Sequence, residues 1–282
     1  MAPRLQRRNH GKSHSYTING AWVPGVTSVI GVLDKPALVA WAANETAAYA
    51  DEHWAELSEL RSADRIERLK KARFQTNRKA IVRGNRVHAL GERVSKGEQI
   101  DEGEIDPALR PWIDAYARFL DDWDIEILHT EIPVGKLDYL YAGTADAFAY
   151  SPRLGTFVLD LKTGKGVYSE VGLQLAAYRY ADIGLQQVEK IGPRGGVKTE
   201  WQEVALPDVD GAYVAHLHED SVEFHEVKAD QQTFESFLYL REIYDSWVRP
   251  TSWDTRNSEE HIRIIGDPIY PEDRPLIEGE EA

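Results

Sequence analysis

The 282-residue chain contains no cysteine. That absence excludes disulfide bonds, zinc sites built on thiolates and cysteine-bound iron–sulfur clusters. No apolar run approaches the roughly 20 residues that a membrane-spanning helix needs, so we expect no membrane partner. The basic N-terminal stretch MAPRLQRRNHGKSH lacks the apolar core of a secretion signal, although its arginines leave a transit peptide open. These absences fit a reducing compartment, and we expect a cytoplasmic protein.

Positive charge is scarce overall: the chain has 33 Lys and Arg but 47 Asp and Glu, which gives a net charge of −14. Such a balance argues at first against nucleic acid as a partner. The cations are unevenly distributed, however: residues 65–86 contain nine Lys or Arg and one acid, Glu67. Near charges outweigh distant ones in salt solution, so this segment can bind phosphates. A solvated helix face is the alternative interpretation.

The hydrophobic period changes from helical to strand-like near residue 124. Before that point the pattern predicts a short helix that breaks before Pro36 and a longer helix from Pro36 onward. Later helices are expected at 62–82, at 84–96 as a third helix or a continuation, and at 106–122. After residue 124 the pattern predicts strands at 125–134, 137–150 and 156–163 and a helix at 169–181. It then predicts a mobile loop at 184–207, a hairpin at 212–229 and a helix at 230–247.

This order predicts an α/β fold with a mixed central β-sheet flanked by helices and an all-helical N-terminal elaboration. We expect three regions. Residues 1–123 form the helical part that carries His88 and the basic helix, residues 124–249 form the core, and residues 250–282 form an acidic, loosely held tail.

Two carboxylates and a lysine fall together in the hairpin that begins at Tyr141. If Tyr150 pairs with Thr156, then Asp146 lies opposite Asp160, and facing residues are about 5 Å apart at Cβ. Two acids that close repel each other unless a cation lies between them. Lys162 shares a sheet face with Asp160 because side chains alternate along a strand. A metal held by both acids and by the Leu161 carbonyl, with Lys162 beside it, suits phosphodiester hydrolysis with Mg²⁺ or Mn²⁺.

Other candidates are ambiguous when taken singly. Gln174 and Tyr178 share one helix face, and they would contact a phosphate or hold the acids. His88 is a helical histidine that could bind metal or simply pack, and Glu131 lies on a strand. The histidines of the later hairpin, His216, His218 and His225, make a zinc site conceivable. Because no fourth ligand is evident, we favour an exposed strand face there.

Taken in order, these motifs resemble the PD-(D/E)XK nuclease superfamily, and most closely its RecB-type branch. That branch includes the CRISPR-associated exonucleases and many phage recombination exonucleases. The motifs are His88, Glu131, the G-x-x-D ending at Asp146, the D-x-K of Asp160–Lys162 and the Q-x-x-x-Y of Gln174–Tyr178. The CRISPR-associated members hold an iron–sulfur cluster through four cysteines, and this chain has none.

The resemblance implies a restriction-endonuclease-like core and roles for single residues. Asp146 and Asp160 would be the central metal ligands, with His88 as a further ligand and Lys162 as the catalytic lysine. Glu131 would lie at the edge of the site and help bind metal or water. Gln174 and Tyr178 would position DNA or the site.

We therefore expect a metal-dependent exonuclease that acts on the ends of linear DNA, in phage-type recombination, repair or replication. A viral source would place it in the host cytoplasm, with recombination or replication proteins as partners. Alternatives are a structure-specific endonuclease, a DNA-binding recombination or packaging accessory with little turnover, and a glycosidase, which Lys162 disfavours. The expected DNA contacts on the basic helix and beside the hairpin are Arg78, Lys79, Arg83, Arg86 and Lys165.

Overall fold

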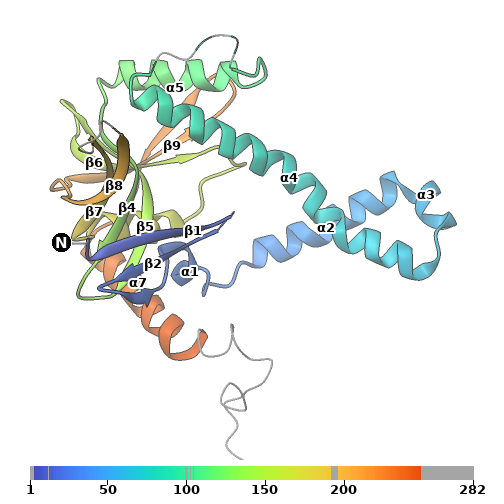
Figure 1. Ribbon diagram of the computed structural model, residues 1–282. Coiled ribbons are helices and arrows are strands. Elements are labelled where there is room, and N and C mark those ends of the chain that lie inside the picture. Colours follow the sequence, from blue (N-terminus) through green and yellow to red (C-terminus); the bar gives the residue numbers. More distant parts are fainter. Residues whose placement is uncertain are drawn as a thin grey trace, which may run out of the picture. The chain divides into compact units, whose positions relative to one another are not determined.

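The computed structural model describes residues 3–11, 13–98, 101, 103, 105–191 and 196–248, without the side chains of residues 75–81 (Figure 1). The chain divides into two compact units, Met1–Arg241 and Glu242–Ala282. The predicted tail at 250–282 lies outside the described residues, as do residues 192–195 of the predicted loop.

A seven-stranded mixed sheet forms the centre of the first unit and confirms the predicted fold class. The strand order is β10-β9-β6-β5-β4-β7-β8. Strands β6 and β9 run parallel, whereas the other neighbours are antiparallel. The strands are β4 (Glu126–Lys136), β5 (Tyr141–Ser151), β6 (Gly155–Lys162), β7 (Ile183–Ile191), β8 (Val197–Ala205), β9 (Gly211–Leu217) and β10 (Val222–Glu226).

The helices begin and end close to the predicted positions. A short helix precedes the break before Pro36, and the two basic segments form one continuous helix, α4, which Figure 1 shows running from α3 to α5. No helix among the described residues is both long and apolar enough to cross a bilayer. The helices are α1 (Val26–Ile30), α2 (Pro36–Glu52), α3 (Trp54–Glu59), α4 (Ser62–Ser95), α5 (Arg110–Asp122), α6 (Glu170–Arg179) and α7 (Gln231–Ile243), and a π-helix, η2 (Tyr244–Val248), follows.

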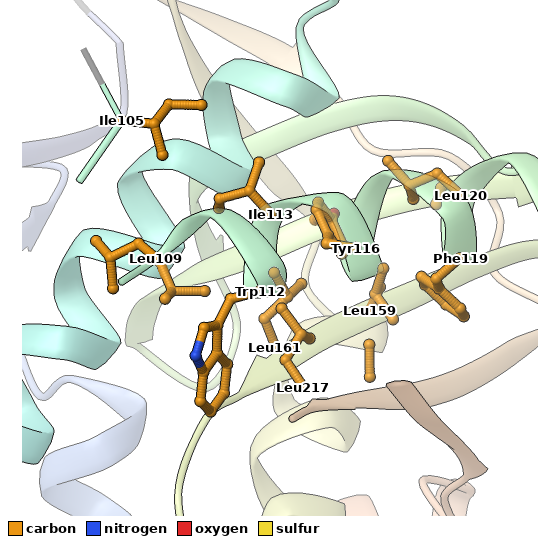
Figure 2. Packing of buried hydrophobic residues seen from close by; sticks show 14 of the residues in the cluster. Ile105, Leu109, Trp112, Ile113, Tyr116, Phe119, Leu120, Leu159, Leu161 and Leu217 are labelled. Atoms are coloured by element: carbon orange, nitrogen blue, oxygen red, sulfur yellow. The ribbon is translucent and has the colours of Figure 1, made fainter. Parts of the chain in front are cut away.

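Helices pack on both faces of the sheet. On one face the odd-numbered residues of β6, Leu159 and Leu161 among them, pack against Trp112 and Tyr116 of α5, as Figure 2 shows. Burial of this apolar surface is the main term that holds α5 to the sheet. Because side chains alternate along a strand, Asp160 points to the opposite face, where α6 packs. The predicted acid pair therefore lies on the α6 side of the sheet.

The N-terminal region is not helical throughout, which corrects the expected all-helical elaboration of residues 1–123. A three-stranded sheet of β1 (Leu5–His10), β2 (Ser13–Ile18) and β3 (Ala21–Val23) precedes the helices. The segment LQRRNH has no strand-like alternation of its own. It becomes a strand because its backbone pairs with β2 from Leu5↔Ile18 onward, and because Leu5 and Ile18 pack against Leu185 of β7.

The prediction of a mobile loop at 184–207 is also wrong. Residues 183–191 and 197–205 form β7 and β8, which pair over their full length from Ile183↔Ala205 to Ile191↔Val197. Only the first part of β7 is buried, so most of the segment is polar and lacks the apolar alternation from which a strand is predicted. Cross-strand contacts such as the Lys190–Glu200 ion pair, at 2.7 Å, hold the solvated part together.

Candidate active site

The predicted hairpin register is present, and it brings the two acids to one face. Tyr150 pairs with Thr156, and the pairing continues to Ala147↔Leu159, so Asp146 and Asp160 occupy the next positions on β5 and β6. The backbone N–H of Leu161 donates to Asp146 Oδ2 at 2.9 Å. This bond fixes the Asp146 carboxylate against the backbone of the D-x-K motif.

Asp160 is a buried carboxylate whose charge is only partly compensated. Its Oδ1 accepts a hydrogen bond from Gln174 Nε2 at 3.1 Å, and its Oδ2 contacts the Lys162 ammonium. Oδ2 accepts no well-formed hydrogen bond from the described residues. Burial, and after it the neighbouring Asp146, raises the pKa of Asp160 to about 7 against the opposing effect of Lys162. An acid held in this way gains from a nearby cation.

Two residues of α6, Gln174 and Tyr178, lie next to Asp160 of β6. Gln174 Nε2 also lies 3.4 Å from the Tyr178 hydroxyl, and the tyrosine is buried, which raises its pKa well above the usual value. Of the two roles predicted for this pair, the geometry favours positioning the site over touching DNA. Gly143, the glycine of the G-x-x-D motif, lies where no side chain fits, because a Cβ there would be 2.6 Å from the Tyr178 ring.

Three side chains from three elements converge beside Asp160. His88 of α4, Glu131 of β4 and Asp146 of β5 place one ligand atom each within 4.8 Å of one another. His88 Nδ1 lies 3.8 Å from Asp146 Oδ2, and the two side chains are 29% and 18% exposed, so solvent reaches them. An imidazole and two carboxylates are donors that a divalent metal accepts.

The helix α4 lies close to the sheet at two glycines of the sequence RGNRVHALGE, and His88 lies between them. A Cβ at Gly84 would lie 2.9 Å from Thr163 Oγ1, just beyond β6. At Gly91 it would lie 3.4 Å from the Tyr116 ring and 3.5 Å from Leu161. At Gly84 a larger residue would therefore displace Thr163 or the helix that carries His88, whereas a Cβ at Gly91 would make ordinary van der Waals contact.

Glu131 reaches the site through an irregularity of β4. It falls between the pairs Thr130↔Ala147 and Ile132↔Ala145, and its φ is +47°. A left-handed conformation at a residue other than glycine costs about 1–3 kcal/mol, so surrounding contacts must hold it. Burial, followed by repulsion from Asp146 and then from Glu92, raises the pKa of Glu131 to about 7. The strained backbone thus directs a third acid towards the same point.

A cleft of about 600 Å³ opens at Glu131, and its lining includes Arg7, Lys96 and Trp201. Arg7 was missed by sequence reasoning, because β1 lies about 140 residues before the acids and only the basic N-terminal run hinted at it. Its Nε is buried and has no hydrogen-bond partner among the described residues. A second cleft of about 1000 Å³ shares Arg7 and Trp201. Its lining also includes the cations Arg4, Arg8, Lys190 and Lys198 and the acids Glu200 and Glu203.

The predicted DNA contacts on α4 already have protein partners where they are described. Arg83 lies over the Trp112 ring, 4.9 Å from its centroid, and Arg86 forms a 3.3 Å ion pair with Asp106. The side chains of Arg78 and Lys79 lie outside the described residues. Lys165 lines a separate cleft of about 510 Å³ with Lys35, Trp41 and Tyr168. Their roles in DNA binding stay predictions.

No protein-family model matches the chain, and a search of curated proteins finds no match either. The case for an activity therefore rests on the geometry of these side chains.

Proposed function

We propose that the protein is a Mg²⁺- or Mn²⁺-dependent deoxyribonuclease of the PD-(D/E)XK type. The observation that carries the proposal is the convergence of His88, Glu131 and Asp146 within 4.8 Å, beside the buried pair of Asp160 and Lys162. Carboxylate-rich sites with one imidazole suit Mg²⁺ and Mn²⁺. A divalent ion supplies an activated water and neutralises charge on the phosphoryl oxygens.

The electrostatics of these side chains, and not only the number of acids, favour a bound cation. Burial and then repulsion hold the pKa of both Glu131 and Asp160 near 7, and Asp160 Oδ2 contacts the Lys162 ammonium without a well-formed hydrogen bond. His88, Glu131, Asp146 and Asp160 would hold the ion, with the Leu161 carbonyl as a further ligand. The donor atoms are mutually repulsive without a cation and mutually supportive with one.

The remaining residues suit the handling of water and phosphate. Lys162 is 35% exposed and its ammonium lies against Asp160, so it can orient the attacking water and balance charge on the phosphate. Glu131 can bind the ion or hydrogen-bond the water that the ion activates. Gln174 holds the Asp160 carboxylate in place.

The two clefts that meet at Arg7 provide a path for a nucleic-acid backbone to Glu131. The larger cleft is lined by cations and by two acids, Glu200 and Glu203, which pair with Arg4, Lys190 and Lys198. Arg7 and Trp201 line both clefts, and Trp201 offers an aromatic face to a base. We propose DNA as the substrate, attacked from the ends of linear molecules, in a cytoplasmic setting with recombination or replication proteins as partners.

The direct experiment is digestion of end-labelled linear DNA with Mg²⁺, with Mn²⁺ and with EDTA. We expect release of label with either metal and none with EDTA. Covalently closed circular DNA is the matched substrate, and it should stay intact if the enzyme needs ends. Cleavage of the circle would instead indicate an endonuclease, and absence of cleavage of every substrate with both metals would overturn the proposed activity.

Replacing Arg7 with glutamine should weaken DNA binding about five- to tenfold and reduce the slope of log affinity against log salt by about one. The reason is the loss of one phosphate contact at the mouth of the cleft that reaches Glu131. Fluorescence anisotropy over a salt series in Ca²⁺ or EDTA measures both quantities. Arg153→Gln is the control, because Arg153 lies in the exposed β5–β6 turn. Equal losses in the two variants would contradict a specific role for Arg7.

A further inference from the structure

Four metal-binding side chains gather on one face of the β9–β10 hairpin. His216 pairs directly with Glu223 across the two strands. His218 follows His216 by two residues, as His225 follows Glu223, so all four side chains share that face. His216 is only 4% exposed, which corrects the expectation of an exposed strand face at this position.

The potential ligand atoms lie close together. His216, His218 and Glu223 place one ligand atom each within 4.8 Å of one another. Glu223 Oε2 lies 3.5 Å from His216 Nδ1, 3.5 Å from His218 Nε2 and 3.6 Å from His225 Nε2. No further ligand beside the three histidines is evident from the sequence alone. Glu223, on the neighbouring strand, is that ligand.

Hydrogen bonding fixes the ring nitrogen that His216 offers. Its Nε2 lies 2.8 Å from the carbonyl oxygen of Gly164, and a carbonyl can only accept, so Nε2 carries the proton. In the neutral ring this leaves the Nδ1 lone pair directed at Glu223. Metal-bound histidines usually donate their other N–H to a carbonyl or carboxylate in this way.

His218 provides a second imidazole nitrogen beside Glu223. Its Nε2 is buried and has no well-formed hydrogen bond with the described residues, although the rest of the ring reaches solvent. A buried polar atom without a partner is costly. Two imidazole nitrogens and a carboxylate that face one another are stabilised by a cation at their centre.

We propose that His216, His218 and Glu223 bind a Zn²⁺ ion, with His225 or a water molecule as the fourth ligand. Imidazole nitrogens and one carboxylate favour Zn²⁺ in tetrahedral geometry, whereas Mg²⁺ prefers oxygen ligands. The ion would fasten β9 to β10 and, through the His216–Gly164 hydrogen bond, hold the loop that follows Lys162. This site is separate from the His88 cluster and does not depend on the proposed nuclease activity.

Zn²⁺ titration calorimetry of the full chain in excess Mg²⁺ tests the site, because Mg²⁺ competes for carboxylate ligands and binds imidazole poorly. We expect one equivalent of Zn²⁺ to bind, and thermal unfolding to move to a higher temperature. His218→Ala and Glu223→Gln should each lower Zn²⁺ affinity at least tenfold. His10→Ala is the control, because His10 is an exposed histidine on β1, and it should bind as the unaltered chain does. Circular dichroism of the metal-free variants checks that they fold.

Two further readouts separate this site from the His88 cluster. Asp146→Asn should keep full Zn²⁺ affinity, and Co²⁺ in place of Zn²⁺ should give the intense visible absorption of tetrahedral coordination. The proposal is overturned if no stoichiometric Zn²⁺ binding occurs, if folded His218→Ala and Glu223→Gln bind like the unaltered chain, or if Asp146→Asn alone abolishes binding.

Discussion

Replacing Asp160 with asparagine is expected to lower metal-dependent DNA cleavage at least about a thousandfold, or on the order of 4 kcal/mol of transition-state stabilisation. Asparagine keeps the shape of the side chain and can still meet Gln174, whose Nε2 lies 3.1 Å from Asp160 Oδ1. It removes the negative charge that would hold a divalent ion beside Asp146. Lys162→Met should have a comparable effect, because it removes the ammonium that contacts Asp160.

Initial rates on linear DNA in Mn²⁺ measure the loss, and DNA affinity in Ca²⁺ or EDTA should change less than about threefold for Asp160→Asn. The matched control is Asp114→Asn, because Asp114 is an exposed acid on α5, away from the apolar face of that helix. Full activity of Asp160→Asn would remove this cluster from consideration as the catalytic site. An equal loss in Asp114→Asn would show that the defect is not specific to the site.

Glu131→Gln is expected to stabilise the metal-free protein at pH 8 by up to about 3 kcal/mol while it removes activity. The pKa of Glu131 is about 7 in the folded protein, whereas its ordinary value is 4.5. Between these values the folded state binds more protons than the unfolded state, so the free energy of unfolding falls as pH rises from about 4.5 to 7. Glutamine carries no charge, so this loss disappears in the variant.

Urea unfolding in EDTA at pH 4.5 and pH 8 measures the effect. The two proteins should be nearly equal at the lower pH and differ most at the higher one. Glu126→Gln is the control, because Glu126 is an exposed acid on the same strand. The variant and the unaltered chain could instead differ in free energy of unfolding by the same amount at both pH values. That result would show that the carboxylate is not buried among like charges. Adding Mn²⁺ should stabilise the unaltered chain and not Glu131→Gln.

Local patterns were sufficient to predict the hairpin that carries Asp146 and Asp160. The alternation of YAGTADAFAY and TFVLDLK set the strand faces, and the Pro- and Gly-containing turn set the register of Tyr150 with Thr156. Pairing in a hairpin depends on residues close in sequence, so the position of one acid opposite the other follows from spacing alone. The same holds for Gln174 and Tyr178, which are one helical turn apart.

Long-range contacts were beyond such reasoning. The strand at 5–10 forms only against β2, and it carries Arg7 to the cleft at Glu131. The β7–β8 pair is largely solvated, so its sequence resembles a loop. Glu223 completes the proposed zinc site only because β10 pairs with β9.

The amino-acid sequence by itself determined that the acids and the lysine share one face of a strand pair, because side-chain direction follows from backbone periodicity. Only the tertiary structure decided that His88 and Glu131 meet Asp146 within 4.8 Å and that Asp160 is buried. These features depend on the close approach of α4 at Gly84 and on the left-handed conformation of Glu131. Packing between distant segments sets such distances, and no local pattern encodes them.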